Sequence, residues 1–277
     1  MKFAKYQGTG NDFVMLSDPY DQIELTPPLV RSLCDRRFGI GADGVIRVAS
    51  SSKANFFMDY ANSDGSPSEM CGNGIRCLAV FARAEGLTED TVIEVDTPSG
   101  VKTVTVEGDR VRVDMGPPIF EPSEIPVTIQ NSGRDALRTK LELQAEILEV
   151  AVLSMGNPHA VLFVKDVSAV PVTILGPRLE EHHVFPNKAN IEFATVDSSD
   201  RIRLRVWERG SRETLACGTG ACAAAVAARL LRGTDARTTV VLRGGDLEIE
   251  WAGSLTDEQS VFMTGPAVEV FRGEISS

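Results

Sequence analysis

The sequence predicts an α/β (α+β) protein of two pseudo-symmetric domains from an internal duplication, each mainly antiparallel sheet around a central helix. Two observations support this. Cys71-Gly72-Asn73-Gly74 and Cys217-Gly218-Thr219-Gly220 each place a thiol before an apolar run, and they lie 146 residues apart. Gly10-Asn11 and Gly156-Asn157 form a second pair at the same separation. Equivalent landmarks in the same order indicate duplication, and we expect the active site in the cleft between the domains.

The segment after each cysteine turn has helical spacing of its apolar residues. The first pattern predicts a helix over about 72–85, and Gly86 is suited to end it. The second predicts a helix that continues to about 232 and ends at Gly233. This helix is so rich in alanine that we expect it to be buried nearly all round.

Alternating apolar residues after each helix predict antiparallel hairpins, with turns at Gly108-Asp109 and Gly244-Gly245-Asp246. Gly-Pro breakers follow in both halves. We therefore expect an N-terminal domain over 1–117 and a C-terminal domain over 118–264, with 118–123 as a linker. Residues 265–277 are expected to pack back onto the first domain. Hinges near 118 and 264 would let the domains close over a substrate.

The composition is that of a globular protein: 277 residues, 43% hydrophobic and 24% charged, with a net charge of −11. This acidic balance argues against a nucleic-acid partner, because such binding uses clustered Lys and Arg. We expect no membrane-spanning segment and no signal or transit peptide. Five cysteines without a signal peptide predict reduced thiols and a cytoplasmic location.

Cys71 and Cys217 are the candidate catalytic residues. A cysteine just before a helix lies where backbone N–H groups favour negative charge, so we expect its thiol to ionise more easily than usual. The same N–H groups can bind a carboxylate, and the neighbouring glycines allow a close approach. Cys34, Cys77 and Cys222 are expected to be buried structural residues instead.

Other cysteine chemistries have weaker support. Zinc sites and dithiol redox centres usually show Cys-x-x-Cys spacing, which is absent. The two histidines at 182 and 183 have no recognisable setting for a cysteine protease. No lysine lies in a recognisable pyridoxal phosphate motif. We therefore expect no metal and no cofactor, while a redox pair of Cys71 and Cys217 stays open.

Several motifs together resemble diaminopimelate epimerase. They cover the whole chain: Gly8-Thr9-Gly10-Asn11-Asp12-Phe13, Gly41-Ala42-Asp43-Gly44, Asn62-Ser63-Asp64-Gly65, Glu69-Met70-Cys71-Gly72-Asn73-Gly74-Ile75-Arg76, Met155-Gly156-Asn157-Pro158-His159, Asn190-Ile191-Glu192-Phe193, Glu208-Arg209-Gly210 and Ala216-Cys217-Gly218-Thr219-Gly220.

The resemblance implies a homodimeric, cofactor-independent epimerase that interconverts LL- and meso-2,6-diaminopimelate, in lysine and cell-wall precursor biosynthesis. Cys71 and Cys217 would be its acid/base pair, and His159 and Glu208 match positions that tune the thiols. The substrate-binding positions of the family fall on Asn11, Asn62, Gly72, Asn73, Asn157, Asn190, Glu208, Arg209, Gly218 and Thr219. Asparagine and arginine suit the zwitterionic ends of this substrate.

One position departs from the family, whose members often have glutamine where this chain has Gly44. Any side-chain contact made there is lost, which affects substrate affinity more than reaction type. The nearest alternative is a proline or hydroxyproline racemase, which typically has histidine at the position of Asn73. An amino-acid-binding module and a redox sensor are the alternatives from other classes.

Overall fold

The structure is a computed structural model that describes residues 1–68, 70–129, 133–143, 146–257 and 259–275. Glu69, part of one family motif, and the last two residues of the predicted C-terminal segment lie outside the described residues. The chain divides into two compact units. Unit 1 comprises Met1–Asp114 and Thr264–Ser277, and unit 2 comprises Met115–Met263.

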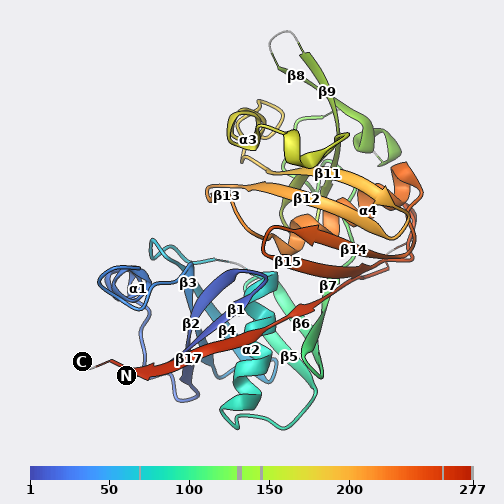
Figure 1. Ribbon diagram of the computed structural model, residues 1–277. Helices are drawn as coiled ribbons and strands as arrows, with labels where there is room; N and C mark the ends of the chain where they lie inside the picture. The colour runs from blue at the N-terminus through green and yellow to red at the C-terminus, as the bar shows by residue number, and fades with distance from the viewer. Residues whose placement is uncertain (69, 130–132, 144–145, 258, 276–277) are drawn as a thin grey trace. The chain divides into compact units, whose positions relative to one another are not determined.

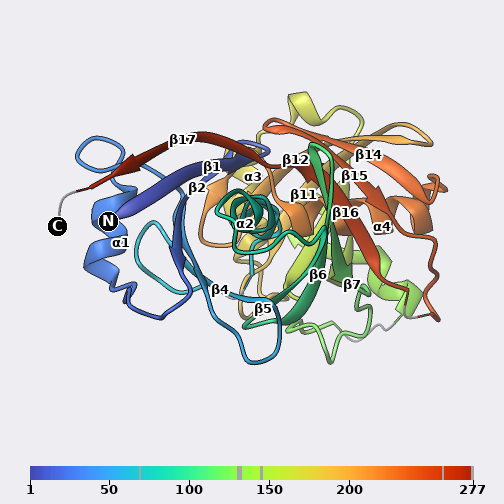
Figure 2. The same ribbon diagram turned by 90° about the horizontal axis from the view of Figure 1, so that it is seen from below.

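Unit 1 is a curved sheet with one long central helix. In chain order its elements are β1 (Lys2–Gly8), β2 (Asn11–Asp18), α1 (Pro27–Cys34), β3 (Gly44–Ala49), β4 (Phe56–Asn62), α2 (Gly72–Ala84), β5 (Val92–Thr97), β6 (Gly100–Glu107), β7 (Arg110–Gly116) and β17 (Val268–Glu274). Figure 1 shows these elements, and Figure 2 looks along α2 with strands of the unit around it.

The pairing in unit 1 is mainly antiparallel. Hydrogen-bonded neighbours follow the order β17, β1, β2, β3, β4, β5, β6 and β7. The β2–β3 and β4–β5 pairs are parallel, and the others in this series are antiparallel. β17 pairs along β1, so the C-terminal strand forms the edge of the sheet of unit 1.

Unit 2 repeats this plan. Its elements are η1 (Gly133–Arg138), β8 (Thr139–Leu143), β9 (Glu146–Ser154), β10 (Pro158–Phe163), η2 (Val167–Ala169), α3 (Val172–Glu180), β11 (Asn190–Ser198), β12 (Arg201–Glu208), β13 (Arg212–Glu213), α4 (Gly218–Arg232), β14 (Arg237–Leu242), β15 (Gly245–Glu250) and β16 (Val261–Pro266), whose last residues belong to unit 1. The 118–123 segment lies in unit 2, where Ile119 pairs with Ser154.

Strand registers show the duplication directly. β10 runs parallel to β11 with His159 opposite Asn190, just as β2 runs parallel to β3 with Phe13 opposite Gly44. Both members of one pair are 146 residues from their counterparts. β11–β12 and β14–β15 are antiparallel and β12–β14 is parallel, which repeats the β3–β4, β5–β6 and β4–β5 pairs of unit 1. The predicted fold class is confirmed.

The two central helices end as the sequence predicts. Gly86 has a φ of +69°, and the N–H of Leu87 bonds back to the Ala82 carbonyl oxygen at 2.9 Å, which is a Schellman cap. Gly233 caps α4 in the left-handed region. Most of α4 is buried, in line with its alanine content, and Cys34, Cys77 and Cys222 are also buried as expected.

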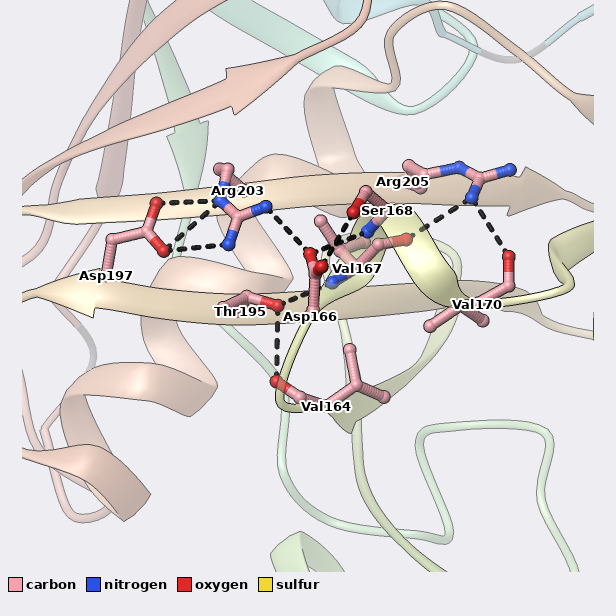
Figure 3. A network of polar contacts seen from close by, with 9 residues as sticks. All are labelled: Val164, Asp166, Val167, Ser168, Val170, Thr195, Asp197, Arg203 and Arg205. Atoms are coloured by element: carbon pink, nitrogen blue, oxygen red, sulfur yellow. Dashed lines mark hydrogen bonds and ion pairs between the residues drawn. The ribbon is translucent and has the colours of Figure 1, made fainter.

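A polar network fixes the connection that follows β10 onto the sheet of unit 2 (Figure 3). Thr195 on β11 accepts a hydrogen bond from the Val167 N–H at 2.9 Å, and Arg205 on β12 donates to the carbonyl oxygens of Val167 and Val170. Arg203 bonds Asp197 and also reaches Asp166 at 3.0 Å. These bonds satisfy backbone groups of η2 and so hold the segment that leads into α3.

Candidate active site

Cys71 is the N-cap of α2, and its surroundings are polar. Its sulfur accepts a hydrogen bond from the Gly74 N–H at 3.4 Å, while its thiol donates to Asn11 Oδ1 at 3.5 Å. The extended backbone of Cys71 (φ −135°, ψ 115°) is typical of an N-cap residue. The sequence therefore placed this thiol correctly at a helix N-terminus, where backbone N–H groups are available for an anion.

Asn11, Asn73 and Cys71 form the first half-site, together with the buried residues that hold them. Asn73 Nδ2 donates to Asn11 Oδ1 at 3.4 Å, and Asn73 Oδ1 accepts from Thr9 at 3.1 Å. Thr9 in turn accepts from Arg76, a fully buried residue of α2, at 3.0 Å. Two of the predicted substrate-binding asparagines are thus oriented by a network within unit 1.

Asn62 and Gly44 face each other across the β3–β4 pair. Asn62 Nδ2 donates to Ser66 at 3.1 Å. A Cβ at position 44 would lie 2.5 Å from Tyr60 Cε2 and 2.6 Å from the Ala61 carbonyl oxygen. Since one of these obstacles is backbone, the local structure requires glycine at this position.

Cys217 is the N-cap of α4 and the centre of the second half-site, which also contains Glu208, Thr219, His159 and Glu192. Its sulfur accepts from the Gly220 N–H at 3.4 Å and lies 3.5 Å from Thr219 Oγ1. The backbone (φ −125°, ψ 116°) closely matches that of Cys71. The two thiols therefore occupy equivalent positions in the duplicated units.

The expectation of an easily ionised thiol is wrong for Cys217. Burial raises its pKa well above the usual value of 9.0, and the negative charges of Glu208 and Glu192 raise it further. The Gly220 N–H and Thr219 act in the opposite direction but are outweighed. The sequence shows the helix N-terminus but not the two carboxylates that lie beside it in the fold. The predicted lowering of the thiol pKa would therefore apply only to the helix without these neighbours.

Glu208 lies at the end of β12 beside Cys217. Its Oε1 accepts a hydrogen bond from the Thr214 hydroxyl group. Burial raises the pKa of the Glu208 carboxyl group, while hydrogen bonds from Thr214 and Cys217 act to lower it. A carboxylate hydrogen-bonded by a thiol is a suitable acceptor for the proton of that thiol.

His159 is fully buried and bonded through both ring nitrogens. Nδ1 lies 2.7 Å from Glu192 Oε1, and Nε2 lies 2.9 Å from Asn157 Oδ1. The structure thus connects two predicted site residues, His159 and Asn157, with a third that the sequence analysis gave no role. Glu192 had one signal in the sequence, since it is a lone charge inside the apolar Ile191–Ala194 run of a buried strand.

Asn190 and Arg209 come together at the start of β11. Asn190 Nδ2 donates to the Pro158 carbonyl oxygen at 3.2 Å, and its Oδ1 accepts from the Arg209 N–H at 2.9 Å. The Arg209 side chain is exposed. Asn190 therefore orients the turn that presents Arg209, and Glu180 supports the same turn by accepting from Gly210 at 3.0 Å.

The described part of the chain contains neither a cluster of metal ligands nor a membrane-spanning helix. Its His, Cys, Asp and Glu side chains form no group of three suited to hold a metal ion. None of its helices has the length and apolar character needed to cross a membrane.

Known proteins resemble the chain throughout. The sequence model of diaminopimelate epimerase matches residues 3–121 and 151–270. The diaminopimelate epimerase of Laribacter hongkongensis is 49% identical over 281 residues, covering 100% of this chain and 99% of that protein. The enzyme of the same name from Moorella thermoacetica is 47% identical over 280 residues, covering 99% of both chains.

Solved structures share the fold at low sequence identity. A phenazine biosynthesis protein of the PhzF family from Bacillus anthracis aligns with a TM-score of 0.72 at 17% identity, over 100% of this chain and 99% of that one. A probable proline racemase from Agrobacterium radiobacter aligns with a TM-score of 0.70 at 15% identity, over 99% of this chain and 92% of that one. These likenesses describe the fold alone.

Proposed function

Because this chain belongs to the diaminopimelate epimerase family, we propose that it is an isomerase that interconverts LL- and meso-2,6-diaminopimelate without a cofactor. The observation that carries the proposal is the pair of equivalent thiols, Cys71 and Cys217, each the N-cap of a central helix in a chain that matches the family along its length. Inversion at one carbon needs a base and an acid on opposite faces, and duplicated half-sites supply one thiol each.

In the proposed reaction one thiolate removes the α-proton of the substrate, and the other thiol protonates the resulting carbanion from the opposite face. The thiolate that begins the reaction becomes a thiol, and the thiol that ends it becomes a thiolate, so no proton is gained or lost. In one direction Glu208 accepts the proton of Cys217 and so prepares it as the base.

The α-proton of an amino acid is a very weak acid, so the developing negative charge must be stabilised. Helix N-termini supply backbone N–H groups for the substrate carboxylate at Gly72 and Asn73 on α2 and at Gly218 and Thr219 on α4. We assign the distal zwitterionic end to the amides of Asn62 and Asn190 and to the exposed guanidinium of Arg209. Asn11 at the start of β2, Asn73 on α2 and Asn157 just before β10 complete the set.

The remaining parts of the proposal concern the state of the protein in the cell. The family resemblance supports a homodimer in the cytoplasm. We also propose that the chain forms one domain over 1–117, joined by a returning 265–277 segment, and a second domain over 118–264. These domains would close about hinges near 118 and 264. Sedimentation velocity of the purified protein tests the dimer, and a monomer at micromolar concentration would contradict it.

The substrate is tested by incubating the purified protein with LL-diaminopimelate and following formation of the meso isomer by chiral chromatography. We expect conversion until both isomers are present at equilibrium. Conversion of proline or hydroxyproline instead would favour the racemase alternative. Binding of diaminopimelate without any isomerisation would indicate a binding module.

The two thiols are tested by Cys71→Ala and Cys217→Ala, each of which should abolish turnover because each removes one of two obligatory proton carriers. Cys77→Ala, which alters a buried cysteine one turn beyond Gly74, is the control. If either active-site variant turned over at a near-normal rate, the two-base reaction would be excluded. A redox sensor would instead need a disulfide between Cys71 and Cys217 for its activity.

A further inference from the structure

The buried carboxyl group of Glu192 is the feature of unit 2 that the proposed reaction does not use. Glu192 and His159 are both 0% exposed, and Oε1 of the carboxyl group lies 2.7 Å from His159 Nδ1. The second oxygen, Oε2, is buried and has no hydrogen-bond partner among the described residues. A buried carboxyl group that is half satisfied is costly, so its presence in a strand interior calls for a reason.

Comparison of the two units sharpens this point. By the 146-residue repeat, Glu192 corresponds to Ile46 and His159 to Phe13. Ile46 and Glu192 also lie against equivalent glycines of the two central helices. A Cβ at Gly74 would meet Ile46 Cδ1 at 2.7 Å, while a Cβ at Gly220 would meet Glu192 Oε1 at 2.8 Å. Two apolar residues of unit 1 are thus replaced in unit 2 by an acid and an imidazole, at a place the fold can fill without polar groups.

We propose that Glu192 is a positioning residue of the second half-site, which holds the His159 ring through Oε1 and places its own charge behind Cys217. The inference rests on the proposed function, because it assigns a role in the same reaction. It concerns a residue that touches His159 and not the substrate.

The first part of this role is the orientation of the ring. A carboxylate 2.7 Å from Nδ1 accepts the Nδ1 proton, which fixes one face of the imidazole and directs Nε2 toward Asn157. Without this acceptor the ring keeps only the contact of Nε2 with Asn157 Oδ1, which favours the tautomer protonated at Nε2. The arrangement resembles an oriented acid–base pair, in which one group acts and a second holds it in place.

The second part is electrostatic. The titratable groups that face Glu192 are His159 on β10, Glu208 on β12 and Cys217 at the start of α4. Burial raises the pKa of the Glu192 carboxyl group, whereas His159 and the Ala160 N–H oppose this. At alkaline pH, where Cys217 loses its proton, the charge on Glu192 disfavours the thiolate. Removing that charge should therefore let Cys217 ionise at lower pH.

Three variants of the full-length protein separate these effects. Glu192→Gln keeps an oxygen at the same place but removes the charge, and Glu192→Leu removes both. Thr195→Val is the matched control, since Thr195 is a buried polar residue of the same strand that belongs to the network in Figure 3 and does not contact His159.

The first readout is the ¹⁵N spectrum of protein labelled at its three histidines, in which His182 and His183 serve as internal references. We expect a protonated Nδ1 at His159 in the wild type and in Glu192→Gln, and loss of that state in Glu192→Leu. Activity should follow the ring: kcat falls by about tenfold or more in Glu192→Leu with little change in KM, and Glu192→Gln restores most of it.

The second readout is the pH at which Cys217 reacts with iodoacetamide, followed by peptide mass spectrometry. We expect this midpoint to fall by roughly one pH unit in Glu192→Gln, the smaller end of the effect of a neighbouring charge. Thr195→Val should leave it unchanged. Identical spectra and identical midpoints in all four proteins would overturn the proposal. An inactive wild type would instead refute the proposed function, while the spectrum and the alkylation would still test Glu192.

Discussion

At the scale of single residues, the properties of a cysteine here depend on its neighbours more than on its position in a helix. Cys77 is a fully buried residue of α2, and burial raises the pKa of its thiol to about 12. Cys217 is also buried, yet it has an N–H donor on one side and a carboxylate acceptor, Glu208, on the other. Only the second environment provides a route by which the thiol can lose its proton and regain it.

Glu208 should set the acid limb of the pH profile. Its pKa is raised from 4.5, so below that raised value the carboxyl group is protonated and cannot accept the Cys217 proton. We expect kcat/KM, measured from pH 4 to pH 9, to fall on the acid side at a pH above about 4.5. Glu208→Gln should be slow throughout and should lack this limb. An unchanged acid limb in the variant would assign it to another group.

Glu208 also makes the stability of the folded protein depend on pH. A carboxyl group whose folded pKa is raised stabilises the fold below its unfolded pKa, and that contribution is lost as pH rises through the folded pKa. Relative to the wild type, Glu208→Gln should therefore gain in free energy of unfolding between acid and neutral pH. Urea unfolding at pH 4.5 and pH 7.5 measures this, and a relative loss at the higher pH would contradict it.

At the scale of elements, sequence patterns located both helix starts, both glycine C-caps and the hairpins, because these are set by residues close together in the chain. The His159–Glu192 contact could not be predicted from the sequence. It joins residues 33 positions apart through the parallel β10–β11 pair, and parallel partners cannot be read from periodicity. The Tyr60 ring that excludes a side chain at Gly44 was also missed, because that contact depends on how side chains pack across the antiparallel β3–β4 pair.

The helix N-termini give a matched pair of substitutions. In Gly74→Ala the new methyl group meets the flexible ends of Ile46 and Met58, at 2.7 and 3.0 Å, which can move apart. In Gly220→Ala it meets Glu192 Oε1 at 2.8 Å and so pushes on a carboxyl group already bonded to His159. We expect Gly220→Ala to lose activity by the larger factor, and both to unfold within about 1 kcal/mol of each other in urea. Equal activity losses would contradict this.

At the scale of the whole molecule, duplication explains how one chain obtains two thiols of equivalent geometry. The repeat in the sequence predicted this, and the matching registers of the two sheets confirm it. The repeat did not predict that the half-sites would differ in chemistry. One is built from neutral amides around Cys71, and the other has two carboxyl groups and an imidazole around Cys217.

The most direct test of the two-base account is deuterium incorporation during the first few per cent of turnover, starting from LL-diaminopimelate in deuterated water. A thiol carries a single proton, so the base that removed a proton can only return that same proton, while the opposite thiol has already exchanged with solvent. We predict α-deuterium in the newly formed meso isomer and almost none in the recovered LL substrate. Equal labelling of substrate and product from the earliest times would show a single exchangeable base and contradict the account.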